Sequence, residues 1–86
     1  MPKITKEEAK ELNIPNTSVQ SILINKNISI NEQKKWLGTH KFKYGKHRSQ
    51  KNYIRWNQLP DIKNAFFTEK HITPDIIFVY QFYSDS

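Results

Sequence analysis

The fold expected for this 86-residue chain is decided by residues 5–23, which read TKEEAKELNIPNTSVQSIL. Thr5 and Glu8 have the spacing of a capping box, the reciprocal hydrogen-bonding pattern that starts a helix. Asn13 tolerates a left-handed backbone and is expected to end that helix. Beyond it, apolar residues recur with the spacing of one helical face, at Val19, Ile22 and Leu23. The pattern predicts two short helices joined by a tight turn over residues 5–24.

A third helix and a basic hairpin are expected next. The helix covers 30–38 and ends at Gly38, one of two glycines in the chain. The hairpin covers 40–56, where strand-favouring residues stand on both sides of a long polar tip.

The last third of the chain predicts one more helix and one strand. Pro60 and Asp61 mark the start of a short helix over 60–67, because proline suits the first turn and an acid suits the helix dipole. The strand over 75–83 is apolar on both faces, so it needs either a central position in the sheet or a partner subunit. Together these elements predict one α+β domain over residues 1–86.

The positive charge is concentrated in the middle of the chain. Lys and Arg number 14 against 8 Asp and Glu, which gives a net charge of +6. Eight basic residues and no acidic one occur from residue 34 to residue 55; they are Lys34, Lys35, Lys41, Lys43, Lys46, Arg48, Lys51 and Arg55. Such a stretch repels itself, and a polyanion relieves that repulsion, so a nucleic-acid ligand is favoured over a merely solvated loop.

The composition also excludes several classes of site. The absence of cysteine leaves no disulfide, thiolate zinc site or thiol nucleophile. The longest apolar run, residues 76–80, is far short of the roughly 20 residues that span a bilayer. The N-terminus turns acidic at Glu7 and lacks a signal-peptide core. A cytoplasmic protein is therefore expected.

Enzymatic and metal sites find little support in the sequence. Pro60-Asp61 followed by Glu69-Lys70 resembles the carboxylate-and-lysine pattern of metal-dependent nucleases, but that pattern has a residue between the acid and the lysine. The three histidines, His40, His47 and His71, fit no metal-ligand spacing. We therefore expect no catalysis, no metal and no cofactor.

Residues 7–23 resemble a helix-turn-helix. That motif needs a small residue facing the second helix, an apolar residue before the turn, a residue that tolerates positive φ, and apolar anchors at fixed offsets. These positions are occupied by Ala9, Leu12, Asn13, Ile14, Val19 and Ile22. The opening, residues 5–9, also resembles excisionase-like and MerR-like winged-helix domains, in which a basic hairpin and a short helix follow. The resemblance covers about residues 4–67.

The resemblance implies a winged helix-turn-helix domain that binds double-stranded DNA without chemistry. Proteins of this kind serve as excisionase-like architectural factors or as small transcription regulators of phages and mobile elements. A recombinase or polymerase is the protein partner implied. The residues do not distinguish an architectural from a regulatory role.

The expected DNA contacts follow from that arrangement. The second helix would lie in the major groove, where Asn16, Thr17, Gln20 and Ser21 face base edges, with a preference for A·T pairs. For Asn16 and Ser18, capping of the helix is an equally good explanation. The hairpin would hold phosphates or enter a minor groove through Lys41, Lys43, Lys46, Arg48, Lys51 and Arg55.

Two other interpretations are left open. Aromatic residues interleaved with basic ones suit stacking on single-stranded nucleic acid, although they more often form core; they are Trp36, Phe42, Tyr44, Tyr53 and Trp56. Alternatively, the chain is a protein-binding module, such as a small phage-encoded inhibitor of a host nucleic-acid enzyme, whose strand at 75–83 adds to a partner sheet. The same strand could support a homodimer.

Overall fold

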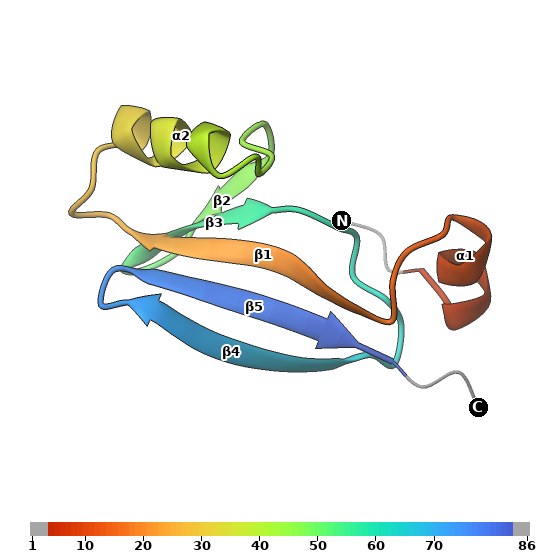
Figure 1. The fold of residues 1–86 in the computed structure, drawn as a ribbon. Coiled ribbons are helices and arrows are strands. Elements are labelled where there is room, and N and C mark those ends of the chain that lie inside the picture. The colour runs from red at the N-terminus through yellow and green to blue at the C-terminus, as the bar shows by residue number, and fades with distance from the viewer. Residues whose placement is uncertain (1–3, 84–86) are drawn as a thin grey trace.

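One antiparallel sheet of five strands organises the computed structural model, which describes residues 4–83. The strands are β1 (Thr17–Asn25), β2 (His47–Ser49), β3 (Tyr53–Asn57), β4 (Phe66–Thr73) and β5 (Ile76–Phe82), in the spatial order β2-β3-β1-β5-β4 (Figure 1). Two helices, α1 (Lys6–Glu11) and α2 (Ile30–Thr39), complete the fold. The expected α+β class is confirmed.

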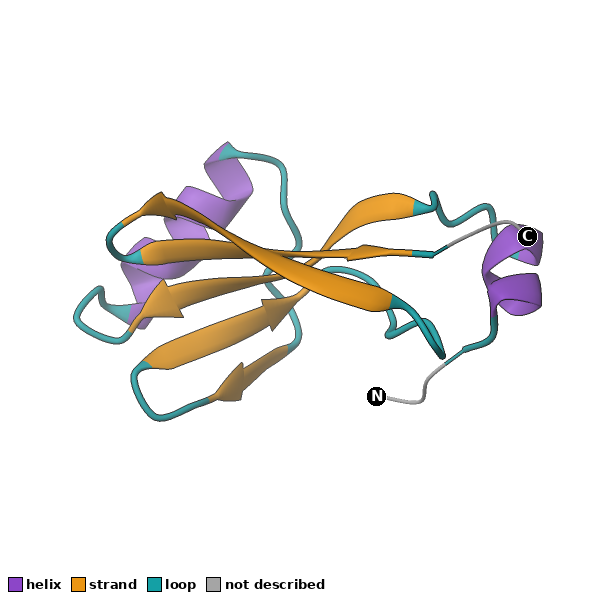
Figure 2. Cartoon of the chain, turned by 90° about the horizontal axis from the view of Figure 1, so that it is seen from below, coloured by secondary structure: helices purple, strands orange, loops and turns teal. Residues whose placement is uncertain are grey.

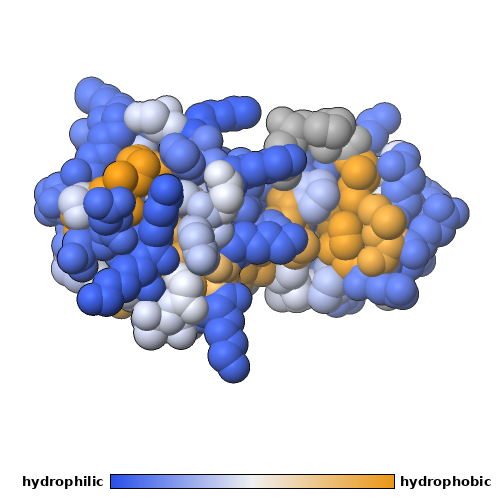
Figure 3. Space-filling view, turned by 90° about the horizontal axis from the view of Figure 1, so that it is seen from above, coloured by the Kyte–Doolittle hydropathy of each residue, from blue (hydrophilic) through white to orange (hydrophobic). Residues whose placement is uncertain are grey.

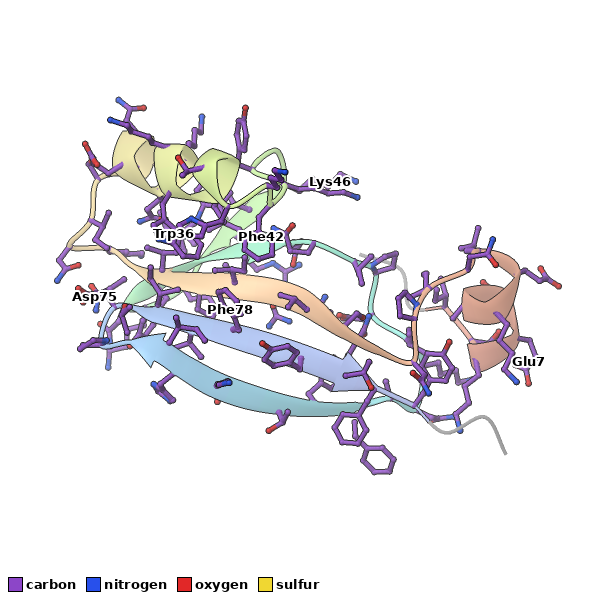
Figure 4. The ribbon with its side chains drawn as sticks, viewed as in Figure 1. Glu7, Trp36, Phe42, Lys46, Asp75 and Phe78 are labelled. Atoms are coloured by element: carbon purple, nitrogen blue, oxygen red, sulfur yellow. The ribbon has the colours of Figure 1, made fainter. Side chains whose placement is uncertain are left out.

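Helix α2 covers one face of the sheet, which we call the helix face (Figure 1). The core between them consists of Ile22, Ile24, Leu37, Trp56 and Ile76. Trp36, Phe42 and Phe78 pack against this core, and the ring of Phe78 meets the other two edge-on at centroid distances of 6.2 and 5.5 Å (Figure 4). Three aromatic residues from the middle of the chain, Trp36, Phe42 and Trp56, therefore belong to the core under the helix.

The opposite face of the sheet, which we call the open face, has no helix of the described residues over it (Figure 2). Its apolar centre consists of Leu23, Ile77 and Val79, with Tyr53 beside them. The connection between β3 and β4 crosses this face near α1. There the side chain of Gln81 donates to Pro60 O (3.1 Å) and accepts from Ile62 N (3.3 Å).

Helix α1 lies at the far end of an elongated molecule, whose extents are 41 × 21 × 20 Å (Figure 1). Its first turn is capped as expected, since Thr5 Oγ1 accepts from Glu8 N at 3.1 Å. Its one buried residue, Ala9, packs with Ile62 and Tyr83 in a small separate cluster. The two ends of the molecule therefore have different cores.

The second helix expected within residues 5–24 is absent, because Thr17–Asn25 form strand β1. The helix-turn-helix prediction is therefore wrong. Every residue from Gln20 to Ile24 is buried, and a helix packed on one side could not bury five consecutive residues. Between β3 and β5, a strand rich in β-branched residues buries both of its faces. The apolar spacing fits a helix equally well, which is a known ambiguity of short runs.

The short helix expected over 60–67 is also wrong. The chain turns there, Asn64 adopts a left-handed φ of 64°, and Phe66 already begins β4. The sequence does not predict this strand, because all eight of its residues are exposed and no alternation of apolar and polar residues marks it.

The remaining elements agree better with the sequence. Helix α2 confirms the helix at 30–38, although it runs one residue past Gly38 and the left-handed residue beyond it is Lys41 (φ 63°). The hairpin is β2–β3, with a shorter first arm than expected, because Phe42 N donates to Leu37 O (2.8 Å) and ties that segment to the helix. Strand β5 confirms the last strand and lies between β1 and β4.

Candidate nucleic-acid interface

The segment between α2 and β2, residues 40–46, forms a basic loop with a fixed backbone. The side-chain amide of Gln58 donates to Lys43 O and accepts from Lys43 N, both at 2.8 Å. Further along, Asn57 N donates to Lys46 O at 3.1 Å. Two lysines of this loop are therefore held at defined positions beside the end of β3.

A groove of about 750 Å³ opens between this loop, α2 and the residues after β3. We call it the lysine groove; its lining consists of Lys34, Lys43, Tyr44, Gly45, Lys46, Asn57, Gln58, Leu59 and Pro60. None of these residues is acidic, and all three lysines are exposed. Lys46 projects outward from its loop (Figure 4), and the surface over α2 is mostly hydrophilic (Figure 3). The groove is thus a concave surface with a positive potential.

A second, smaller hollow of about 80 Å³ adjoins this groove. We call it the arginine hollow; it is lined by Gln20, Arg48, Arg55, Asn57 and Asp61. Asn57 lines both cavities, so the two meet at the last residue of β3. Arg48 and Arg55 are direct partners in the β2–β3 register.

The buried side chain of Gln20 positions two other residues that line the arginine hollow. It occupies the bulge where the β1–β5 register shifts between Val19 and Ser21, and only 1% of it is exposed. Its Oε1 accepts from Arg55 Nη2 at 2.6 Å, and its Nε2 donates to Asp61 Oδ1 at 2.6 Å and to Leu59 O at 3.0 Å. A buried amide thereby fixes one guanidinium and one carboxylate.

A third hollow, of about 680 Å³, lies on the open face. Leu23 and Val79 contribute its apolar part, and Arg55, Asp61 and Glu69 contribute charges of both signs. It shares Arg55 and Asp61 with the arginine hollow, so these two hollows are adjacent. Asp61 and Glu69, the acids of the nuclease-like pattern, both line this hollow; among the described residues no group of three or more His, Cys, Asp or Glu could hold a metal ion.

The residues expected to read DNA bases are not brought together for that purpose. Gln20 and Ser21 are 1% and 0% exposed, so they cannot reach a base edge, and their assignment as base contacts is wrong. Asn16 and Thr17 are exposed, but they stand before and at the start of a strand rather than on a helix. The error has one cause, which is the assignment of β1 as a recognition helix.

The residues expected to hold phosphates divide between the cavities and the open surface. Lys43 and Lys46 line the lysine groove, and Arg48 and Arg55 line the arginine hollow. Lys41 and Lys51 are exposed and line neither cavity.

Of the five aromatic residues considered for stacking, Tyr44 alone combines exposure with a place in the lysine groove. It is 50% exposed, whereas Trp56 is 0% exposed. Trp36 and Phe42 pack in the core under α2, and Tyr53 packs beside the open-face cluster. The core interpretation holds for these four residues.

Sequence reasoning did not place Lys34, Asn57 and Gln58 in the site. Lys34 belongs to the charged stretch, but its contribution depends on α2 lying beside the basic loop. The role of Gln58 is a contact across 15 residues, for which local sequence carries no signal. Only the density of positive charge pointed to this region.

No protein-family model, curated protein or solved structure matches the chain. Among the described residues, no helix is long and apolar enough to cross a membrane. The candidate interface therefore has to be interpreted from its own geometry.

Proposed function

We propose that this chain is a non-catalytic nucleic-acid-binding protein that holds the phosphate backbone in the lysine groove. The observation that carries the proposal is the convergence of Lys34, Lys43 and Lys46 on one groove whose lining contains no acid. Bringing three ammonium groups together costs repulsion, which a polyanion relieves. Lysine is a mobile point charge, so it suits phosphate contacts that position a ligand without reading its sequence.

Double-stranded DNA, the ligand implied by the resemblance, enters the proposal through its backbone alone, because Gln20 and Ser21 are buried and the exposed Asn16 and Thr17 do not lie on a helix that could enter a groove. An architectural or regulatory role in a phage or mobile element would use the same contacts. A single strand is the second form of ligand. It is favoured by Tyr44, whose exposed ring in a basic groove offers a surface on which a base can stack.

The test is fluorescence anisotropy of a labelled duplex and of its single strand, titrated at about 50 and 200 mM salt, between which several phosphate contacts lose orders of magnitude in affinity. Combined alanine substitution of Lys34, Lys43 and Lys46 should reduce the slope of log affinity against log salt by about 2.7 for a duplex or about 2.1 for a single strand. Tyr44→Leu should weaken single-strand binding and leave duplex binding unchanged.

The matched control removes the same charge elsewhere, by alanine substitution of Lys26, Lys63 and Lys70, all of them exposed and outside the groove. We expect this variant to keep most of the affinity. Equal losses in the two triple variants would show that net charge, rather than the groove, determines binding.

A protein-binding module is the second candidate function, and a separate observation favours it. Edge strand β4 is exposed along its whole length and carries Phe66, Phe67 and Ile72, which are 62, 48 and 42% exposed. An edge strand offers unpaired backbone groups to a partner strand. Strand β5, the strand expected for this role and for a homodimer, pairs with β1 and β4 and has no free edge.

This candidate makes a contrasting prediction. Neither nucleic acid should bind at about 50 mM salt, where phosphate contacts are strongest. A host protein captured by the wild-type chain should be lost with Phe67→Lys, because a charge on the edge strand opposes strand addition.

A further inference from the structure

The chain places its two arginines directly opposite each other, although its sequence holds 12 lysines. Like charges at directly opposed positions of an antiparallel pair destabilise it, because their Cβ atoms lie roughly 5 Å apart. Both side chains line the same small hollow. This arrangement is unfavourable in the free protein and favourable once an anion lies between the two guanidinium groups.

One of the two guanidinium groups is already oriented. Arg55 Nη2 donates to Oε1 of Gln20, which is itself fixed by Leu59 and Asp61. A guanidinium has five N–H donors, and within the described residues the Arg55 guanidinium uses one of them for this hydrogen bond. Arg48 is exposed, so its side chain can approach the same anion from β2.

The size and position of the arginine hollow limit what it can hold. Its volume is about 80 Å³, and a water molecule takes roughly 30 Å³ in the liquid, so the space suits a group of a few heavy atoms. Asp61 lines the hollow and opposes an anion, which leaves one positive charge in excess. Asn57 lines both this hollow and the lysine groove, so the two are neighbours on the surface.

We propose that Arg48 and Arg55 jointly bind one phosphate group, namely a phosphate of the nucleic-acid strand whose neighbouring phosphates lie in the lysine groove. This inference rests on the proposed function. Paired forks of planar donors match the oxygens of a phosphate, which explains why arginine occupies these two positions in a chain that uses lysine elsewhere. The path of the strand then runs along α2 and the basic loop, past Asn57, to the open face.

The experiment uses the fact that two arginines give two side-chain Nε–Hε signals in an NMR spectrum of ¹⁵N-labelled protein. Arg48→Lys and Arg55→Lys assign the signals and keep the charge while removing the fork. The probes are inorganic phosphate and a single strand of about ten thymidines, a length within the footprint of small single-strand binders. Lys70→Arg, on β4, is the control for an equally small change outside both cavities.

We expect both signals to shift together and to saturate with the oligonucleotide. Each Arg→Lys variant should bind the oligonucleotide about tenfold more weakly, because it loses a charge-assisted hydrogen bond to the phosphate. The control Lys70→Arg should bind it as tightly as wild type. Asp61→Asn, which keeps an oxygen for Gln20, should tighten binding because it removes the opposing charge. If Arg55→Lys does not fold, Arg48→Lys at its exposed position is sufficient for the test.

Three other results overturn the inference in different ways. If the arginine signals saturate with inorganic phosphate but not with the oligonucleotide, the two arginines bind phosphate, but the proposal that one nucleic-acid strand occupies both the arginine hollow and the lysine groove is refuted. Oligonucleotide binding that depends on Lys34, Lys43 and Lys46 but moves neither arginine signal would refute the arginine site and support the proposed function. Failure of both probes and of the duplex to bind would refute the proposed function itself.

Discussion

Three buried glutamines, Gln20, Gln33 and Gln81, join distant segments of the chain at the scale of single residues. Gln33 is 0% exposed, and its Oε1 accepts from Trp56 Nε1 at 2.7 Å. Its Nε2 donates to Ile28 O at 2.9 Å and to Asn25 O at 3.3 Å. One side chain therefore joins α2 to the indole at the centre of the core and to the turn after β1.

We expect Gln33→Leu to lower the free energy of unfolding by roughly 2–3 kcal/mol, because a shape-preserving change leaves the Trp56 N–H and Ile28 O without their partner, whereas Asn25 O keeps the hydrogen bond from Ile28 N. Urea unfolding followed by Trp fluorescence measures this. Lys34→Leu, one position along on the exposed side of the same helix, is the control and should stay within about 0.5 kcal/mol of wild type. A Gln33→Leu variant as stable as wild type would contradict the role assigned to this amide.

Gln20 shows that local sequence does not reveal whether a polar side chain is exposed or buried. Its polar neighbours in an expected helix predict a base contact, yet it is buried at a bulge and binds Arg55 and Asp61, which are 35 and 41 residues away. Burial of a polar side chain is decided by partners distant in the sequence. Gln20→Ala should therefore change stability and the orientation of Arg55 rather than sequence preference.

At the scale of elements, the two helices can be predicted from the sequence because their signals are local. Thr5 and Ser29 both cap a first turn, at 3.1 Å to Glu8 N and 3.3 Å to Glu32 N. The sheet is harder to predict because its evidence is not local. Strand β1 has a helix-like apolar spacing, and its neighbours β3 and β5 begin 36 and 59 residues after it (53 − 17 and 76 − 17).

The two caps should differ in their effect on stability. Ser29→Ala should lower the global free energy of unfolding by about 1 kcal/mol, because α2 covers the main core. Thr5→Ala should act mostly locally, because α1 has six residues and buries one of them. Urea unfolding measures the first effect, and amide hydrogen exchange within α1 measures the second.

Ser29→Asp provides the control, since aspartate also caps helices well. It should retain wild-type stability. If Thr5→Ala were the more damaging change in urea, the small cluster around α1 would be part of the global folding unit.

At the scale of the whole molecule, acidic and basic residues are unevenly distributed along the long axis. Glu7, Glu8 and Glu11 lie on the surface of α1, at one end (Figure 1). The acid-free stretch from residue 34 to residue 55 covers most of α2, the basic loop and the β2–β3 hairpin. This asymmetry could be predicted from the sequence, because charge is additive and needs no fold. What could not be predicted was that three lysines of the stretch would line one groove.

The clustering of charge predicts opposite effects of salt on the free protein and on its complex. The Debye length falls from roughly 20 Å at about 20 mM to roughly 7 Å at about 200 mM salt, so repulsion within the basic stretch is screened. The melting temperature of the free protein should therefore rise by a few degrees over this range, as expected for a change of about 0.5–1 kcal/mol in a domain of this size. Over the same range the affinity for nucleic acid should fall steeply, because salt competes for the phosphates. Thermal unfolding followed by circular dichroism measures the first effect.

Two triple variants test whether the lysine groove causes the rise of the melting temperature with salt. Combined alanine substitution of Lys34, Lys43 and Lys46 should flatten this rise, and the same substitution of Lys26, Lys63 and Lys70 should preserve it. If the melting temperature of the wild-type protein does not change or falls with salt, the lysines are too far apart to repel one another, and relief of their repulsion can no longer favour a polyanionic ligand.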